Sequence, residues 1–132
     1  MLLRILSYNI RRGGTGHEDA LAGLLRRCEA DIVVLQEATS AESVARIARS
    51  AGMEQWVSRR GDSLGFISRR RVESYGWHKP RMSRHAFLEI QPTGSDMRIF
   101  GVHLSAVHAA WTESRRVVEF RALLKSIARH QN

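Results

Sequence analysis

The chain has 132 residues, a length that suits one domain with a hydrophobic core of its own. Its hydrophobic content of 43% and charged content of 26% are ordinary for a soluble globular protein. No stretch approaches the roughly 20 apolar residues of a membrane span, and the opening MLLRILSYNI is too short and too polar for a signal peptide. We therefore expect neither export nor a membrane anchor, and a cytoplasmic location.

The net charge is +8, and 19 of the 21 basic residues are arginines. Their density peaks over residues 59–84, where eight basic residues are opposed only by Asp62 and Glu73. A basic surface of this kind attracts phosphates, nucleic acid or anionic lipid. An arginine-rich composition with a solvated surface explains the same numbers equally well, so the charge supports a phosphate-bearing ligand without establishing one.

The first part of the chain predicts two strands joined by a helix. Residues 3–9 are typical of a strand, and the glycine-rich RRGGTG that follows is typical of a turn. Thr15 stands three residues before Glu18, the spacing of a capping box, which predicts a helix start near Gly16. The apolar positions of this helix repeat as one inward face: Leu21, Leu24, Leu25 and Cys28. Residues 31–37 then predict a buried strand parallel to the first.

The remaining chain predicts a second helix, several strands and a closing helix. Residues 41–52 fit a helix with Ser40 as its N-cap and Gly52 as its stop. The strand-like segments that follow are EQWVSRR, SLGFISRR, VESYGWHK, HAFLEIQ and MRIFGVHL. A last helix starts near Thr112, and its single apolar face comprises Val117, Phe120, Leu124 and Ile127. The whole chain reads as one α/β unit.

Polar side chains end the first two strands, which raises the question of why a buried strand should stop at a carboxylate. Asn9 ends the first strand and Glu37 the second. Because parallel strands bring their carboxyl ends to one sheet edge, both side chains should project there, where open α/β sheets bind ligands. An amide oxygen beside a carboxylate suits Mg²⁺. The spacing is equally compatible with Asn9 making a turn and with Glu37 acting as a cap or pairing with an arginine.

His103 is a third candidate. It stands at the end of an apolar strand in FGVHLSA, where it could donate a proton or a hydrogen bond to a phosphate. A single histidine in a strand is more often structural, and the local pattern leaves both interpretations open.

Five segments in order carry a resemblance to a known family: LRILSYNIRRG, DIVVLQEA, LGFISRR, RHAFLEI and RIFGVHLSA. They resemble the endonuclease/exonuclease/phosphatase family, which has the fold of pancreatic deoxyribonuclease. The match runs over essentially the whole chain, and SYNI and DIVVLQE together are fairly specific. The resemblance implies an α/β fold that is half of a four-layer α/β/β/α sandwich, with one mixed sheet and helices on its outer face.

The same resemblance implies roles for four residues. Asn9, the asparagine of the first motif, orients the phosphate and supports the metal site. Glu37 is the ligand of Mg²⁺, with Mn²⁺ as the alternative ion, and His103 contacts the scissile phosphate. Arg84, which opens the RHAFLEI segment, resembles a phosphate-facing position.

The chain departs from the family pattern after its last helix. The family continues with a Gly-Asp-x-Asn motif and an Asp-His pair, which supply the general base, a transition-state asparagine and a further metal contact. This sequence contains no Gly-Asp-x-Asn, and its RGDS at 60–63 predicts a hairpin turn. Residues 1–132 therefore resemble the N-terminal part of such a domain, with the C-terminal part absent.

The resemblance implies a Mg²⁺-dependent phosphodiester or phosphomonoester hydrolase, incomplete as this chain. The alternative is a non-catalytic module that binds phosphate or nucleic acid. The expected partners are a phosphate-ester substrate, nucleic acid among the candidates, and either a second copy of the chain or a missing C-terminal half. We expect that pairing because the sheet face away from the helices would otherwise expose its apolar side chains to water.

Overall fold

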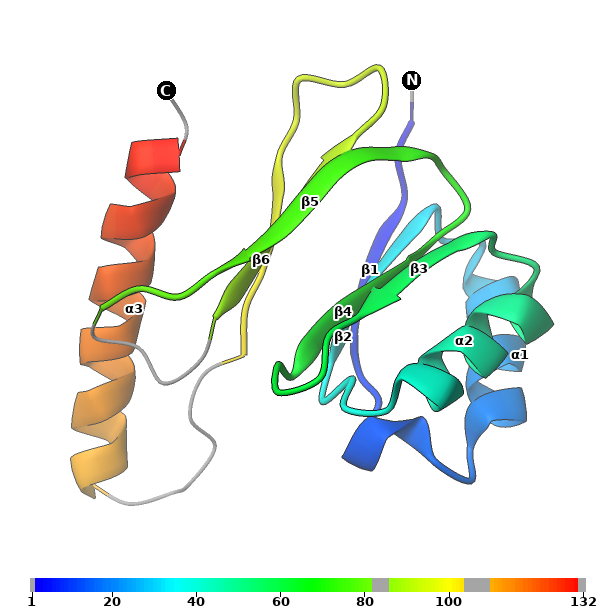
Figure 1. Cartoon of the computed structure of the whole chain (residues 1–132), viewed down its shortest axis with the longest axis horizontal. Helices are drawn as coiled ribbons and strands as arrows, with labels where there is room; N and C mark the ends of the chain where they lie inside the picture. Colours follow the sequence, from blue (N-terminus) through cyan, green and yellow to red (C-terminus); the bar gives the residue numbers. More distant parts are fainter. Residues whose placement is uncertain (1, 82–85, 104–109, 131–132) are drawn as a thin grey trace.

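The computed structural model describes residues 2–81, 86–103 and 110–130. The chain alternates helices and strands first and then runs through strands to a final helix (Figure 1). The elements are β1 (Ile5–Asn9), a short 3-10 helix η1 (Arg12–Gly14), α1 (Glu18–Cys28), β2 (Ile32–Gln36), α2 (Ala41–Ala51), β3 (Gln55–Ser58), β4 (Leu64–Ser68), β5 (Val72–His78), β6 (Phe87–Pro92), β7 (Ile99–Gly101) and α3 (Ala110–His130).

The first four strands form a mixed sheet in the order β1-β2-β4-β3. β1 and β2 are parallel, as the strand–helix–strand pattern predicts, whereas β2 and β3 both run antiparallel to β4. Helices α1 and α2 cover one face of this sheet. The buried side chains between them include Leu25, Val33, Leu35, Val44, Ile47 and Ile67.

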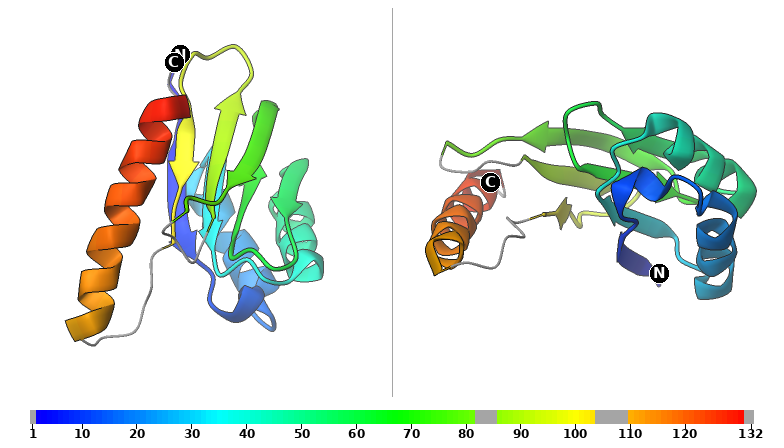
Figure 2. Two further views of the ribbon diagram at one scale, coloured as in Figure 1. Left: turned by 60° about the vertical axis from the view of Figure 1, so that its left-hand side comes forward. Right: turned by 90° about the horizontal axis from the view of Figure 1, so that it is seen from below.

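The other three strands form a separate antiparallel sheet in the order β5-β6-β7. It packs on the face of the first sheet that α1 and α2 leave free, and the side chains between the sheets include Val34, Phe66, Leu88 and Ile90. Helix α3 lies on the far side of the second sheet, so the chain has α, β, β and α layers in sequence (Figure 2).

The α/β class and the outer helices are therefore confirmed, and two details differ from the sequence prediction. The strands divide into two hydrogen-bonded sheets instead of one. The inner face of the first sheet is also covered, since Val34 is 3% and Phe66 0% exposed. A seven-strand alternation cannot reveal this division, because strands that face a second sheet and strands that face a helix carry the same apolar pattern.

The strands of the second sheet lie over those of the first in a defined alignment. β5 lies over β3 and β4, because the backbone N–H of Val72 donates to Gln55 at 2.8 Å and the ring of Tyr75 meets Phe66 edge-on at 5.4 Å. β7 lies over β2, with Gly101 against Val34. Among the described residues, β1 and β7 are thus the neighbouring edge strands of the two sheets.

Helix α1 begins later than its capping-box pattern predicts. Its N-cap is His17, and Thr15 makes no cap; its hydroxyl lies 3.4 Å from that of Ser43. Glu18 instead accepts a hydrogen bond from Ser43 at 3.2 Å. The pKa of Glu18 is lowered, chiefly because its own backbone N–H donates to the carboxylate. The capping prediction is wrong because Ser43 of α2, rather than Thr15, donates to the Glu18 side chain at the start of α1.

The predicted inner face of α1 is also rotated. Ala22 and Leu25 are buried, Leu21 and Leu24 are half-buried, and Cys28 is exposed rather than packed. Helix α2 agrees with its prediction: Ser40 accepts from the backbone N–H of Ser43, and Gly52 ends the helix in the left-handed region at φ 70°.

Helix α3 carries its apolar positions outward. Val117, Phe120 and Leu124 are each about half exposed, whereas Leu123 is 6% exposed. The face predicted to be inward is therefore largely open to solvent, and the contact with the rest of the fold comes from a neighbouring position.

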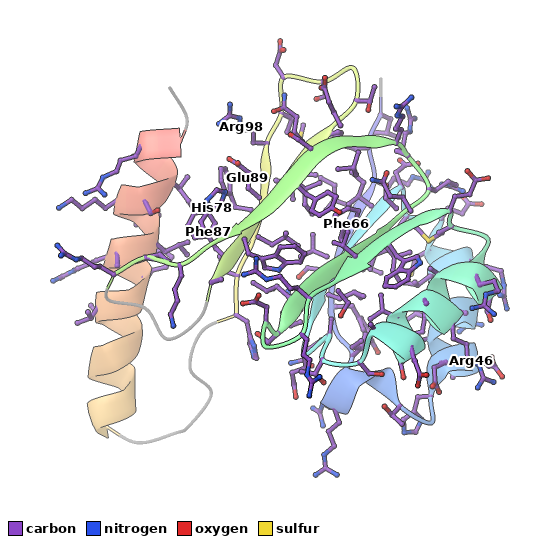
Figure 3. All side chains as sticks on the ribbon, in the orientation of Figure 1. Arg46, Phe66, His78, Phe87, Glu89 and Arg98 are labelled. Carbon is purple, nitrogen blue, oxygen red and sulfur yellow. The ribbon has the colours of Figure 1, made fainter. Side chains whose placement is uncertain are left out.

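A polar cluster lies on the second sheet (Figure 3). The carboxylate of Glu89 of β6 lies between two basic groups, with one oxygen 3.4 Å from His78 Nε2 and the other 3.5 Å from Arg98 Nη1. The ring of His78 also contacts Phe87 at 5.1 Å. The cluster connects β5, β6 and the segment that leads into β7.

Among the helices of the described residues, none has the length and apolar composition that a membrane span requires.

Candidate active site

Asn9 and Glu37 come together at one edge of the first sheet. In the parallel register of β1 and β2, Asn9 is paired with Gln36, so Glu37 follows directly beside the end of β1. Ile10 continues the ladder by donating its backbone N–H to the Gln36 carbonyl at 3.1 Å. Asn9 is exposed and Glu37 is half-buried. The strand-end placement on which the sequence prediction depends is therefore present.

The backbone around this edge is strained and tightly tied. Glu37 has φ 56°, and Arg11 and Arg12 have φ 52° and 47°, a region that costs non-glycine residues about 1–3 kcal/mol each. The Glu37 carbonyl accepts two backbone hydrogen bonds, from Gly13 and from Thr39, both at 2.9 Å. Such conformations persist only where the surrounding contacts hold them in place, as these two hydrogen bonds do at Glu37.

The polar groups of Asn9 and Glu37 meet backbone donors. Asn9 Oδ1 accepts from the backbone N–H of Arg11 at 2.9 Å, and Glu37 Oε1 lies 3.5 Å from the backbone nitrogen of Arg12. Among the ion pairs formed by the described residues, none involves Glu37. Glu37 thus pairs with no arginine side chain among the described residues. The other parts of that alternative are present, since Asn9 makes a turn and Glu37 lies at the start of η1.

His103 lies at the same end of the sandwich. Its Nδ1 is 3.0 Å from Ser63 Oγ, and the Ser63 carbonyl accepts the backbone N–H of Ala38, the residue after Glu37, at 2.9 Å. Ser63 therefore connects the histidine of the second sheet to the carboxylate-bearing end of β2. The sequence pattern gave no signal for Ser63, because a serine after a hairpin turn is common. Arg84, the fourth candidate, lies outside the described residues.

A basic groove borders this edge. It has a volume of about 790 Å³ and lies between the end of β1 and helix α1. One wall is the run from Tyr8 through Asn9 to Arg12, and the other is a face of α1 that carries His17, Leu21, Leu24 and Arg27. Sequence periodicity places Leu21 and Leu24 in the core. Because both also line this groove, they are only half-buried, and Ala22 and Leu25 are the buried positions of α1.

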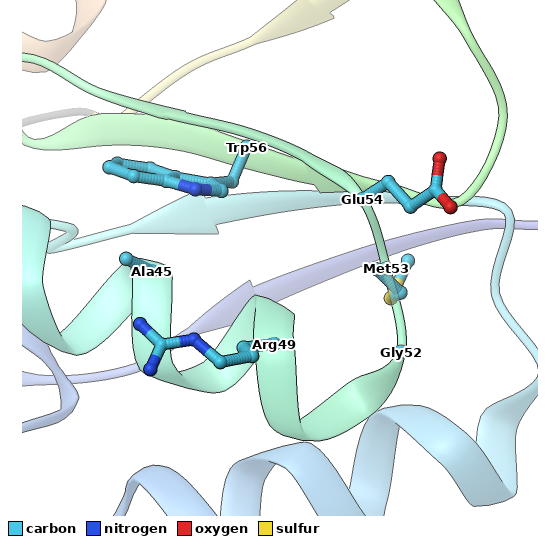
Figure 4. Close-up of a pocket in the computed structure, with 6 residues that line it drawn as sticks. All are labelled: Ala45, Arg49, Gly52, Met53, Glu54 and Trp56. Atoms are coloured by element: carbon cyan, nitrogen blue, oxygen red, sulfur yellow. The ribbon is translucent and has the colours of Figure 1, made fainter.

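A second hollow of about 550 Å³ lies between α2 and β3, at the opposite edge of the first sheet (Figure 4). Its walls include Arg49 on α2 and Trp56 on β3. None of the candidate site residues lines this hollow, whereas Asn9 lines the groove beside α1. The groove is therefore the hollow that belongs to the candidate site.

The donor atoms at the Asn9–Glu37 edge fit a hard cation. Carboxylate and amide oxygens are the ligands that Mg²⁺ accepts, and this ion commonly takes only one or two carboxylates and fills its shell with water and substrate phosphate. The set is small: no group of three or more histidine, cysteine, aspartate or glutamate side chains gathers within the described ranges. Glu37, with Asn9 beside it, would hold such an ion only with help from a phosphate.

No protein-family model matches the sequence, and no curated protein matches it. Solved structures do match. Humanized D. rerio TDP2, carrying 14 mutations, superposes with a TM-score of 0.73 at 21% identity, over 96% of this chain and 56% of that one. C. elegans TDP2 gives 0.73 at 18% identity, over 98% and 44%.

A third match is an endonuclease/exonuclease/phosphatase from Beutenbergia cavernae, with a TM-score of 0.71 at 17% identity over 93% of this chain and 43% of that one. This chain thus spans between 43% and 56% of the length of these three structures. At such low identities the likeness is one of fold. The chain has the endonuclease/exonuclease/phosphatase fold.

Proposed function

We propose that this chain carries the metal- and phosphate-binding part of a Mg²⁺-dependent phosphodiesterase site that acts on nucleic acid. The observation that carries the proposal is the meeting of Asn9 and Glu37 at one sheet edge, with His103 tied to the same edge through Ser63. D. rerio TDP2, one of the proteins of this fold, has been seen with a single-strand DNA product, and the net charge of +8 suits a polyanionic ligand.

Each residue has a distinct role in this proposal. Glu37 would hold the ion, and Asn9 would orient the phosphate beside it. A bound Mg²⁺ would neutralise charge that develops on the phosphate oxygens. His103 would donate a hydrogen bond from Nε2 to the same phosphate, while Ser63, at 3.0 Å from Nδ1, fixes the orientation of the ring.

The test is Mg²⁺-dependent hydrolysis of bis-p-nitrophenyl phosphate by the full chain. We expect slow turnover, because this sequence carries no Gly-Asp-x-Asn motif. Glu37→Gln and His103→Ala should each lower the rate by about 10²–10³-fold, as removal of a group that stabilises transition-state charge does. Glu42→Gln, on the exposed first turn of α2, should leave it unchanged.

A non-catalytic phosphate-binding module is the second candidate, favoured by the net charge of +8, which attracts phosphates without any catalytic group. It predicts no Mg²⁺-dependent turnover above the rate of Glu37→Gln, together with binding of an oligonucleotide. That result would refute the hydrolase for this chain.

A further inference from the structure

We propose that the groove between β1 and α1 binds a single-stranded nucleic acid, holding the phosphates that lie next to the one at Asn9. The inference rests on the proposed function, since it extends the same site. Asn9 lines the groove together with residues of α1, so a strand whose phosphate sits at the sheet edge would enter the groove directly.

The charge of the groove supports this assignment. Arg11, Arg12 and Arg27 line it, and none of them forms an ion pair with an acidic side chain within the described residues. Other arginines of the same part of the fold are paired, for example Arg4 with Glu29 at 2.8 Å and Arg46 with Asp19 at 3.3 Å. In the part of the chain that the structure describes, the groove therefore keeps positive charge that no acidic side chain pairs with.

The apolar part of the groove matches bases rather than phosphates. Tyr8 is 36% exposed on the β1 wall, and Leu21 and Leu24 are half-buried on the α1 wall, where Arg27 also lies. Sites for single strands combine these features, because the backbone follows positive charge while base faces lie on aromatic or apolar side chains.

The length of the groove favours a strand over a single phosphate headgroup. His17 and Arg27 both line it, and because the Arg27 guanidinium folds back to the level of Gly23, its charge lies about six residues along the helix from His17, a distance of about 9 Å at ~1.5 Å per residue. That distance corresponds to roughly three nucleotide steps at the ~3.4 Å axial rise of a stacked strand. One headgroup would not reach both ends.

Arg27 is directed toward the candidate site. A Cβ added at Gly23 would lie 3.5 Å from Arg27 Nη1, so the guanidinium folds back over the preceding turn of α1, in the direction of His17. A larger side chain at Gly23 would occupy part of that path. The charge is therefore placed above the middle of the groove rather than at the far end of the helix.

The experiment measures fluorescence anisotropy of a labelled single-stranded DNA of about 12 nucleotides, with the full chain in EDTA. Arg27→Ala should weaken binding roughly fivefold, as expected for one exposed charge contact, and Arg27→Glu should weaken it further. The slope of log K against log salt should become shallower by about 0.7 for each contact removed. Arg27→Lys should largely restore binding.

Arg49→Glu is the matched control. Arg49 also stands in the last turn of an eleven-residue helix, so its change carries the same helix-end penalty, but it lines the other hollow. Equal loss of DNA binding in Arg27→Glu and Arg49→Glu would overturn the proposal. It would also be overturned if Arg27→Glu bound phosphoinositide vesicles more weakly but bound DNA like wild type. Because the assay contains no metal, it measures DNA binding apart from hydrolysis, and Glu42→Gln, in the exposed first turn of α2, should bind DNA like wild type. Failure of the groove and failure of the hydrolase are thus separate results.

Discussion

Gly101 of β7 lies directly against Val34 of β2, and a Cβ added to Gly101 would come within 2.6 Å of Val34 Cγ1. At this point the two sheets approach so closely that only a residue without a side chain fits. His103 follows two residues later, so the same contact sets how near the histidine comes to the end of β2. The close approach thus serves both packing and the candidate site.

Gly101→Ala should destabilise the fold by about 1–3 kcal/mol, because the added methyl group forces the sheets apart. Urea unfolding followed by circular dichroism measures this. Gly76→Ala is the control: it also lies in a strand of the second sheet, but its added Cβ would meet only His78 Nε2, at 3.8 Å. Equal stability of the two variants would show that the sheets are not in contact at Gly101.

Glu37 should determine Mg²⁺ affinity. With one carboxylate and one amide the ion should bind weakly, in the millimolar range, and more tightly when inorganic phosphate completes its coordination. Titration calorimetry of wild type and Glu37→Gln should show the heat of binding in the wild type alone. Equal binding by both proteins would exclude Glu37 as the ligand.

Asp31 should make stability depend on pH. Its pKa is lowered, first because the backbone N–H of Arg4 donates to the carboxylate at 2.8 Å, and then because Arg69 and Arg70 lie near it. A lowered folded-state pKa stabilises the fold above the unfolded value of about 3.9, and that stability is lost as the pH falls through the folded value.

Asp31→Asn should therefore lower the free energy of unfolding by about 1–3 kcal/mol at neutral pH, the range for hydrogen bonds to a charged group. The difference from wild type should shrink below about pH 4. Urea unfolding between pH 7 and pH 3 measures it, and a difference that stays constant over this range would contradict the assignment.

The open edge of β1 should support association. Leu2, Ile5 and Tyr8 are 74%, 44% and 36% exposed there, beside the equally open edge of β7. We expect a second copy, or a further polypeptide segment, to pair with this edge. Ile5→Lys should weaken self-association about tenfold or more in light scattering, given ~1.5–3 kcal/mol for burying an isoleucine. Trp56→Lys, on the edge strand β3, should have little effect.

Much of the local structure follows from sequence. The parallel pairing of β1 and β2, the limits of α2 with its Ser40 and Gly52 caps, and the strand-end positions of Asn9 and Glu37 were all predictable. Each depends on short-range chemistry: apolar periodicity, a hydroxyl that caps a helix, and a glycine that accepts positive φ. The resemblance in SYNI and DIVVLQE likewise pointed to the fold that the solved structures share.

Only the tertiary structure decided which apolar face meets which neighbour. Leu24 repeats like a core residue yet lines a groove, and Leu21 lines the same groove while packing against the core. Cys28 is exposed, and the inner face of the first sheet is covered by β5–β7. A period of apolar residues shows that a face avoids water but does not identify what covers it, because the hydrophobic effect is non-directional. Ser63 beside His103 has the same origin: residues 40 positions apart meet only because two sheets stack.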